Sequence, residues 1–275
     1  MKNIVTFIFI LTTFISCLEK NKKNLEDNKS NNDTIRKIYY DSNRKLKEVF
    51  FKDSILIKYY LNGNVFSEGK LNRQNQRIGS WKFYTKEGYL SEIREYFVIK
   101  DEPYLNQNIY FSKEDSDYWM DTKDEKFNLY SQSDFYSDTL TYHKTFYAEF
   151  DLGKDTININ EPWRAVCYYY TPVFQDKNSE VIVVMSGADK NFNKDFSNIQ
   201  EIKKDTFHNL QKDVSNQKHF PDDDPNYTVV FGKWFKTPGK KTLRGYLSEN
   251  YTKKDSGYKE KRIFFEKTIF VKDSI

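Results

Sequence analysis

The sequence has few of the residues on which disulfide-stapled or membrane-spanning folds depend. Its 275 residues include only two cysteines, six prolines and ten glycines. Two cysteines form at most one disulfide bond, so the chain is not a disulfide scaffold. Its longest mainly apolar run, Ile4 to Ile15, is shorter than the ~20 residues that a membrane-spanning helix needs. A stop-transfer helix is therefore disfavoured.

Charge of either sign is not in large excess. The chain has 44 Lys and Arg residues against 40 Asp and Glu residues, which gives a formal net charge of +4 at pH 7. Cations and anions alternate in segments such as "KEKRIFFEK", residues 259–267. Nucleic-acid binding calls for a clustered basic face, so we expect no nucleic-acid partner. The charge pattern favours a solvated surface of mixed sign.

Aromatic residues, in contrast, are abundant. They make up 17% of the chain, with 21 Tyr and 23 Phe, and such residues favour the pleated, half-buried surfaces of β-sheets. We therefore predict a mainly all-β fold. The order of segments described below predicts N-terminal β-hairpin repeats, followed by a β-sandwich with one inserted helix.

The N-terminus has the layout of a secretory signal over residues 1–16, with an early cation and a short apolar region. The quartet "FISC", residues 14–17, resembles the lipobox of bacterial lipoproteins. This resemblance implies that the thiol of Cys17 carries a diacylglyceryl group and that the preceding peptide is removed. The alternative is an ordinary signal cleaved after some small residue, although no A-x-A-like site competes nearby.

Residues 17–37 are rich in Asn, Lys and acidic residues. Such a segment buries too little apolar surface to offset the entropy of ordering, so we predict a lipidated, flexible tether. The protein would then be a membrane-anchored lipoprotein of the cell envelope, with the membrane as a partner through Cys17. The sequence leaves open which membrane, and which face of it, is involved.

Three self-similar segments follow the tether, and each has an aromatic residue, a turn residue, an apolar residue and an acid in the same order. When the first aromatic residues are aligned, the three sets are Tyr40, Asn43, Leu46 and Glu48; Tyr60, Gly63, Phe66 and Glu68; and Tyr84, Gly88, Leu90 and Glu92. A turn residue that tolerates positive φ between two alternating strands predicts a β-hairpin in each segment.

The segments "KYYLNGNVFSEG" and "GSWKFYTKEGYLSE" resemble the MORN-variant repeats of bacterial envelope proteins and of the YwqK-type antitoxin family. The resemblance covers residues 38–97. It implies a stacked run of hairpins and, most often, protein interaction, with no shared catalytic residues to transfer. A cytoplasmic antitoxin would also fit the repeats, but it conflicts with the secretion signal.

The repeats supply the first candidate binding residues. An exposed aromatic recognition strip would contain Tyr40, Tyr60, Trp81 and Tyr84. The alternative is that most of these residues form the core of the repeats, because aromatic residues at period-two positions are usually buried. The three aligned glutamates would form a carboxylate ladder, or they would pair with lysines across strands.

Residues 98–141 include an acidic stretch, and we expect an irregular connector there, although the start of another decayed repeat is the alternative. From residue 142 to 275, short aromatic and β-branched runs alternate with Gly, Pro and Asp clusters, which predicts a β-sandwich. This region resembles immunoglobulin-like modules of flavobacterial-type envelope lipoproteins. Ser197 and Gln200 form a capping-box pattern, and the apolar spacing after it predicts a helix that ends before Pro221.

Two polar features of the C-terminal region are candidate sites. Asp222, Asp223 and Asp224 follow His219, and three adjacent carboxylates would bind Ca2+. The alternative is a turn, since Asp beside Pro commonly forms one. Cys167 lies in an apolar run and is expected to be a small buried residue, with a catalytic thiol as the alternative.

We find no pattern of a nucleotide, dinucleotide or serine-hydrolase site, so no catalytic residues and no cofactor are predicted. Ser186 lacks the preceding glycine of a nucleophile elbow. We therefore expect a non-catalytic binding or scaffold module with envelope proteins as partners. The alternative is an envelope hydrolase acting on polysaccharide or peptidoglycan. A histidine near Ser186 or paired carboxylates in one cleft would favour the enzyme. A flat aromatic face would favour the binding module, and the oligomeric state stays open.

Overall fold

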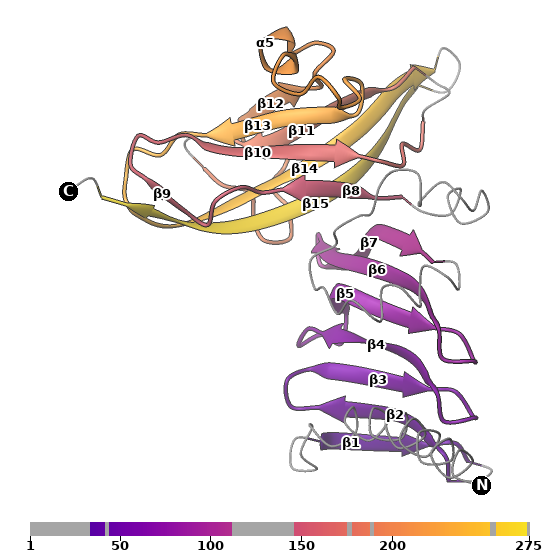
Figure 1. Cartoon of the computed structure of the whole chain (residues 1–275). Helices are drawn as coiled ribbons and strands as arrows, with labels where there is room; N and C mark the ends of the chain where they lie inside the picture. Colours follow the sequence, from indigo (N-terminus) through magenta and orange to yellow (C-terminus); the bar gives the residue numbers. More distant parts are fainter. Residues whose placement is uncertain are drawn as a thin grey trace, which may run out of the picture.

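The computed structural model describes residues 34–41, 44–111, 146–174, 178–187, 190–253 and 257–273. These residues form antiparallel sheets almost throughout, and the described part contains one short α-helix, α5 (Val214–Gln217). The predicted all-β class is therefore confirmed. Figure 1 shows two parts, a column of strands at the N-terminal side and a pair of packed sheets at the C-terminal side, which we call the stem and the head.

The stem is one seven-stranded antiparallel sheet in which every strand pairs with its neighbours in sequence. Short connections between consecutive antiparallel strands produce this meander. The strands are β1 (Thr34–Tyr39), β2 (Leu46–Phe51), β3 (Ile55–Tyr59), β4 (Val65–Leu71), β5 (Arg77–Tyr84), β6 (Leu90–Ile99) and β7 (Glu102–Tyr110). In Figure 1, β1 lies at the end of the column that is remote from the head, and β7 lies next to the head.

The three repeats form hairpins, as expected, but their register differs by one residue from the sequence alignment. The residue opposite the start of the second strand is Tyr39, Tyr59 and Tyr84 in the three hairpins, paired with Leu46, Val65 and Leu90. Each pair is followed by a register shift at the same place, so the same bulge recurs in all three hairpins.

This register moves one member of the expected carboxylate ladder to the other face of the sheet. The structurally equivalent positions are Glu48, Ser67 and Glu92, which lie opposite Ile38, Lys58 and Phe83. Because side chains alternate between faces with a period of two, the one-residue difference places Glu68 on the opposite face.

The turns explain the shift. The second turn closes with the Tyr60 amide donating to Asn64, and the third closes with the Thr85 amide donating to Tyr89. Gly63 and Gly88 occupy the left-handed positions of these turns, at φ +93° and +98°, where only glycine avoids strain. Tyr60 is thus equivalent to Thr85 and not to Tyr84.

The stem extends beyond the expected repeat range at both ends. Its first strand begins at Thr34, inside the range 17–37 expected as tether. Its last strand, β7, lies inside the range 98–141 expected as an irregular connector, and it pairs with β6 along its length. Residues 112–145, which hold the acidic stretch, lie outside the described residues.

The head contains a three-stranded sheet and a five-stranded sheet. The first has the order β13 (Thr228–Lys233), β10 (Trp163–Tyr169) and β8 (Ala148–Asp151). The second has the order β12 (Lys204–His208), β11 (Glu180–Ser186), β14 (Gly239–Lys253), β15 (Gly257–Lys272) and β9 (Thr156–Asn158). Strands β14 and β15 pair along their length as one long antiparallel hairpin.

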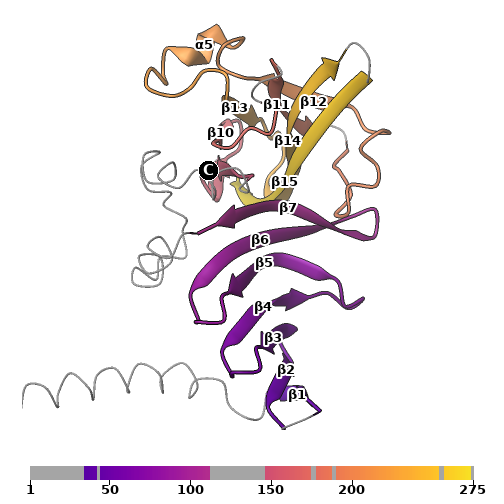
Figure 2. The same ribbon diagram turned by 90° about the vertical axis from the view of Figure 1, so that its right-hand side faces the viewer.

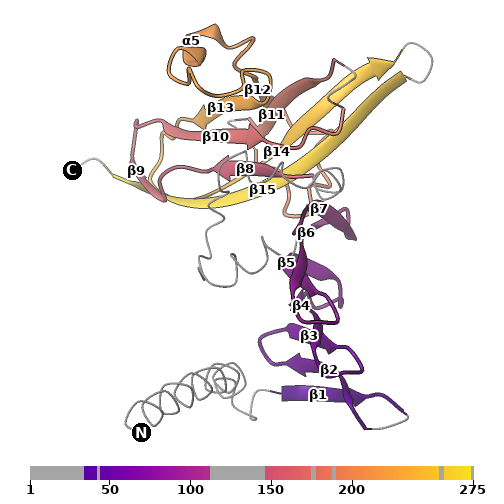
Figure 3. The same cartoon turned by 45° about the vertical axis from the view of Figure 1, so that its right-hand side comes forward.

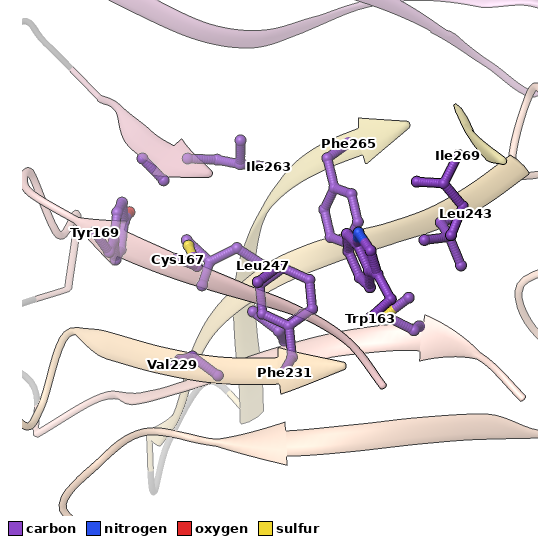
Figure 4. Packing of buried hydrophobic residues seen from close by; sticks show 14 of the residues in the cluster. Trp163, Cys167, Tyr169, Val229, Phe231, Leu243, Leu247, Ile263, Phe265 and Ile269 are labelled. Carbon is purple, nitrogen blue, oxygen red and sulfur yellow. The ribbon is translucent and has the colours of Figure 1, made fainter. Parts of the chain in front are cut away.

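The two sheets of the head enclose its hydrophobic core, as a β-sandwich requires. Alternate residues of β10 point inward, and Figure 4 shows Trp163 and Cys167 facing residues of the long hairpin such as Leu247 and Phe265. Cys167 is fully buried and unpaired, which confirms its expected place in the core. Burial raises the pKa of its thiol well above the ordinary value, so it is not poised as a nucleophile.

The long helix predicted from Ser197 onward is wrong. Ser197 donates its hydroxyl to Asp195 instead of capping a helix, and Lys204–His208 is the strand β12, paired with β11. The apolar residues that suggested helical spacing are buried separately: Ile199 and Ile202 pack in a cluster with Phe264. Tertiary packing and sheet pairing therefore override the local pattern, and α5 is a single turn capped by Asp213.

The stem joins the head through side chains of β6 and β7. The side-chain amide of Asn106 donates to the backbone carbonyl of Phe264 (2.9 Å) and accepts from the backbone amide of Phe264 (2.6 Å). This side chain therefore pairs with β15 as a neighbouring strand would. Tyr104 donates its hydroxyl to the Arg262 carbonyl, and its ring contacts Phe264 edge-on. Figures 2 and 3 show β7 lying against the head in both views. Stem and head are thus joined by a hydrogen-bonded, apolar junction.

Candidate functional site

The aromatic residues proposed for a recognition strip in the repeats have structural contacts. Tyr40 donates its hydroxyl to the Tyr59 carbonyl at 2.8 Å, and Tyr60 donates to the Tyr84 carbonyl at 2.9 Å. Each hydroxyl therefore ties one hairpin to the next, and Tyr84 donates to Glu68 at 2.8 Å. All three tyrosine side chains are part of the stem's internal hydrogen bonding.

Trp81 lies in the core of the stem. It is fully buried, and its ring covers Gly69, where an added Cβ would come within 2.4 Å of the indole. The Arg77 guanidinium lies 4.7 Å from the centroid of the Trp81 ring, and the indole N–H of Trp81 donates to the Lys70 carbonyl. These contacts favour the core interpretation over an exposed strip.

Two of the three glutamates of the repeats are paired with cations, and the third, Glu68, accepts from the Tyr84 hydroxyl. Glu48 forms an ion pair with Lys58 on the adjacent strand at 3.7 Å. Glu92 is buried and binds Arg94 through both carboxylate oxygens, at 2.6 and 2.7 Å. Cross-strand pairing with lysine, the alternative to a ladder, is observed for Glu48.

The acidic run of the C-terminal region does not gather ligands for a metal. Asp224 accepts from the amide and side chain of Asn226, as in a local turn, and His219 is exposed. Within the described residues, no group of three or more His, Cys, Asp or Glu side chains is placed to hold a metal ion. Cys17, the expected lipidation site, lies outside the described residues.

Within the described residues, Ser186 contacts no histidine. It is buried, and its hydroxyl donates to Asn191 at 2.8 Å. Its cross-strand partner is Lys204, whereas His208 pairs opposite Ile182, four residues along the strand or roughly 13 Å away. His208 instead contacts Glu180. A serine–histidine pair is therefore not formed here.

The best candidate site is a surface on the outer side of the three-stranded sheet of the head. We call it the tyrosine face and define it by Glu149, Asp151, Tyr168, Tyr170 and Asp223. The inward residues of β10 fill the core, so the alternate residues Tyr168 and Tyr170 point outward and are half-buried. Glu149 lies directly opposite Tyr168 on β8, with Asp151 two residues further on.

The rings of the tyrosine face lie nearly parallel. The Tyr168 and Tyr170 ring centroids are 6.3 Å apart with an interplanar angle of 20°. Tyr147, which is buried beside the junction with the stem, continues the row at 6.3 Å and 6° from Tyr170. The Tyr170 hydroxyl donates to Glu149 at 3.1 Å and fixes the carboxylate beside the rings.

The electrostatics of this surface are dominated by negative charge. Burial, and then the charge of Asp151, raise the pKa of Glu149. Burial raises the pKa of Tyr168, and the nearby charges of Asp223, Asp151 and Glu149 raise it further. Burial and Asp222 likewise raise the pKa of Asp223. Burial disfavours a charge of either sign, whereas the contributions of the neighbouring carboxylates specifically disfavour one more negative charge and favour a positive one.

The tyrosine face was not predicted from the sequence. Its only local signal is "CYYYTP", residues 167–172, where three consecutive tyrosines in a half-buried strand must place at least one ring on the outer side. The carboxylates come from another strand and from the loop after α5, so only the fold brings them beside the rings.

Another buried carboxylate has a structural role. Glu249 on β14 is fully buried, and its two oxygens accept four hydrogen bonds, from the Tyr169 hydroxyl, the amides of Val173 and Phe174, and the Ser179 hydroxyl. It therefore holds the connection between β10 and β11 onto the five-stranded sheet.

The chain matches no protein-family model, no curated protein and no solved structure. Among the residues that the structure describes, no helix has the length and apolar character needed to cross a membrane.

Proposed function

We propose that the protein is a lipid-anchored, non-catalytic binding module of the cell envelope. The lipid on Cys17 would hold it at the membrane, a short flexible arm would follow, and the stem would carry the head outward. The observation that supports this proposal is the arrangement of the stem. Its first strand, at the N-terminal end, lies remote from the head, and its last strand is joined to the head by Asn106 and Tyr104.

The stem would act as a spacer. Its seven strands make six inter-strand steps, and steps of ~4.8 Å give a length of roughly 29 Å. Because the junction combines main-chain-like hydrogen bonds with buried aromatic contacts, stem and head would move as one body. Anchoring would raise the effective concentration of the tyrosine face near other envelope components.

The anchor is tested by the substitution Cys17→Ala in cells. We expect the normal protein to enter the detergent phase and to carry the mass of a diacylglyceryl group, because each buried CH2 contributes ~0.8 kcal/mol to membrane binding. The Cys17→Ala variant should lose both properties. The matched control is Cys167→Ala, which removes the other cysteine and should keep both. An unchanged mass and phase for Cys17→Ala would refute the anchor.

A second candidate is an envelope hydrolase acting on polysaccharide. It is favoured by Glu149 and Asp151, two carboxylates on one face of β8, whose Cα atoms are about 7 Å apart in an extended strand. Burial raises the pKa of Glu149, as a general acid requires. Glycan hydrolysis that is abolished by Glu149→Gln would establish this activity. Its absence would leave the binding module.

A further inference from the structure

The carboxylates of the tyrosine face lack compensating cations. Glu149 accepts only from the Tyr170 hydroxyl, Asp151 accepts from the Gly153 amide of its own turn, and Asp223 has no side-chain hydrogen bond. None of the three is paired with Lys or Arg within the described part of the chain. Elsewhere in the molecule Glu48, Glu92, Glu161, Glu180, Glu260 and Glu266 form ion pairs, whereas the buried Glu249 has four hydrogen-bond donors in place of a cation.

These carboxylates lie together in a chain that carries a net charge of +4. Lysine is plentiful, yet no lysine reaches these carboxylates in the described ranges. Arg164 is the nearest cation on the outer side of β10, and it lies four residues from Tyr168, roughly 13 Å along the strand. Like charges held together without partners repel one another, so a cationic ligand would stabilise them.

The rings add a second feature that attracts cations. Tyr168 is half-exposed, and its ring lies nearly parallel to that of Tyr170. A Lys or Arg side chain gains about 0.5–2 kcal/mol over an aromatic face, most when partly desolvated. The stem of the same molecule uses this contact, with the Arg94 guanidinium 4.5 Å from the Phe83 ring centroid.

We propose that the tyrosine face binds a basic segment of a partner protein, whose Lys or Arg side chains lie against Tyr168 and pair with Glu149, Asp151 and Asp223. The inference rests on the proposed binding role and names the class of partner. Polypeptide is favoured over a single small cation because the three carboxylates come from β8 and from the loop after α5, and a chain with several cations reaches them together.

The test uses the full-length protein in detergent and the peptide octalysine as the probe, with affinity measured by calorimetric titration at low and moderate salt. We expect saturable binding that weakens as salt rises, because exposed ion pairs are screened. The double substitution Glu149→Gln with Asp223→Asn, and separately Tyr168→Ala, should each weaken binding by about tenfold or more.

Matched controls separate this surface from general charge effects. Asp41→Asn and Glu201→Gln together remove two exposed carboxylates elsewhere, and Tyr258→Ala removes a tyrosine that is 58% exposed. Both controls should bind octalysine normally. Equal losses in controls and test variants would overturn the proposal, as would binding of an amino-sugar oligomer but not of octalysine. Binding does not require the lipid, so failure of the anchor at Cys17 leaves this result unaffected.

Discussion

Glu249 should be among the most important single side chains for the stability of the head. It is completely buried in β14, and no cation neutralises it among its four hydrogen-bond donors. A buried carboxylate is tolerated only where its oxygens are fully hydrogen-bonded. Truncation by Glu249→Ala would leave the Val173 and Phe174 amides and two hydroxyls without their acceptor.

The magnitude follows from these donors. Hydrogen bonds to a charged group contribute about 1.5–3 kcal/mol each, so four would give roughly 6–12 kcal/mol if nothing replaced them. Water reaching the loop offsets part of this, because Val173 is 50% exposed. We therefore expect Glu249→Ala to lower the free energy of unfolding by about 3–5 kcal/mol, less than the full sum for four such hydrogen bonds. Glu249→Gln should cost less, because its amide oxygen still accepts.

Chemical denaturation followed by near-ultraviolet circular dichroism measures this change, and Glu201→Ala, at an exposed glutamate, is the control. At about 2–4 °C per kcal/mol for a chain of this size, the melting temperature should fall by roughly 6–20 °C. A loss below about 1 kcal/mol for Glu249→Ala, similar to the control, would show that the four hydrogen bonds do not stabilise the head.

Three further predictions concern the stem, the junction and the tyrosine face. Gly69→Ala should destabilise the stem by about 1–3 kcal/mol, because the new methyl group overlaps the Trp81 ring. Denaturation of the double variant Gly69→Ala with Trp81→Phe should show a loss of stability smaller than the sum of the two single losses. Asn106→Leu removes the hydrogen bonds to β15 and should lower the free energy of unfolding by roughly 2–4 kcal/mol. Calorimetry of this variant should then resolve separate transitions for the stem and the head. A single unchanged transition would contradict the role of the junction. Octalysine affinity should fall as the pH drops from neutral to mildly acidic. Burial raises the pKa of Glu149, and its protonation removes the charge that attracts the peptide. An affinity that does not change with pH over that range would exclude Glu149 from the contact.

Local patterns were enough to predict the fold class and most strands. Alternating aromatic and β-branched residues specify strands because one face must be buried, and this holds for β10 and for the long hairpin of β14 and β15. Gly63 and Gly88 marked two turns correctly because positive φ is a property of the residue itself. The buried state of Cys167 followed from its apolar neighbours in the same way.

Features that depend on distant contacts were not predictable from the sequence. Residues 197–214 had the spacing of a helix, but pairing of Lys204–His208 with β11 and burial of Ile199 against Phe264 are long-range effects. The alignment of the repeats was wrong by one residue because equivalent positions are set by the hydrogen bonds that close each turn, and a sequence alignment cannot detect hydrogen-bond pairing.

The sequence by itself determined that this chain folds into hairpins and a sandwich, because the alternation of apolar and polar residues is a local property of each strand. The tertiary structure alone decided the tyrosine face and the junction. Glu149, Tyr168 and Asp223 are far apart in the chain and meet only when β8, β10 and the loop after α5 come together. Asn106 pairs with a strand that begins about 150 residues later, and no local pattern carries information about such a contact.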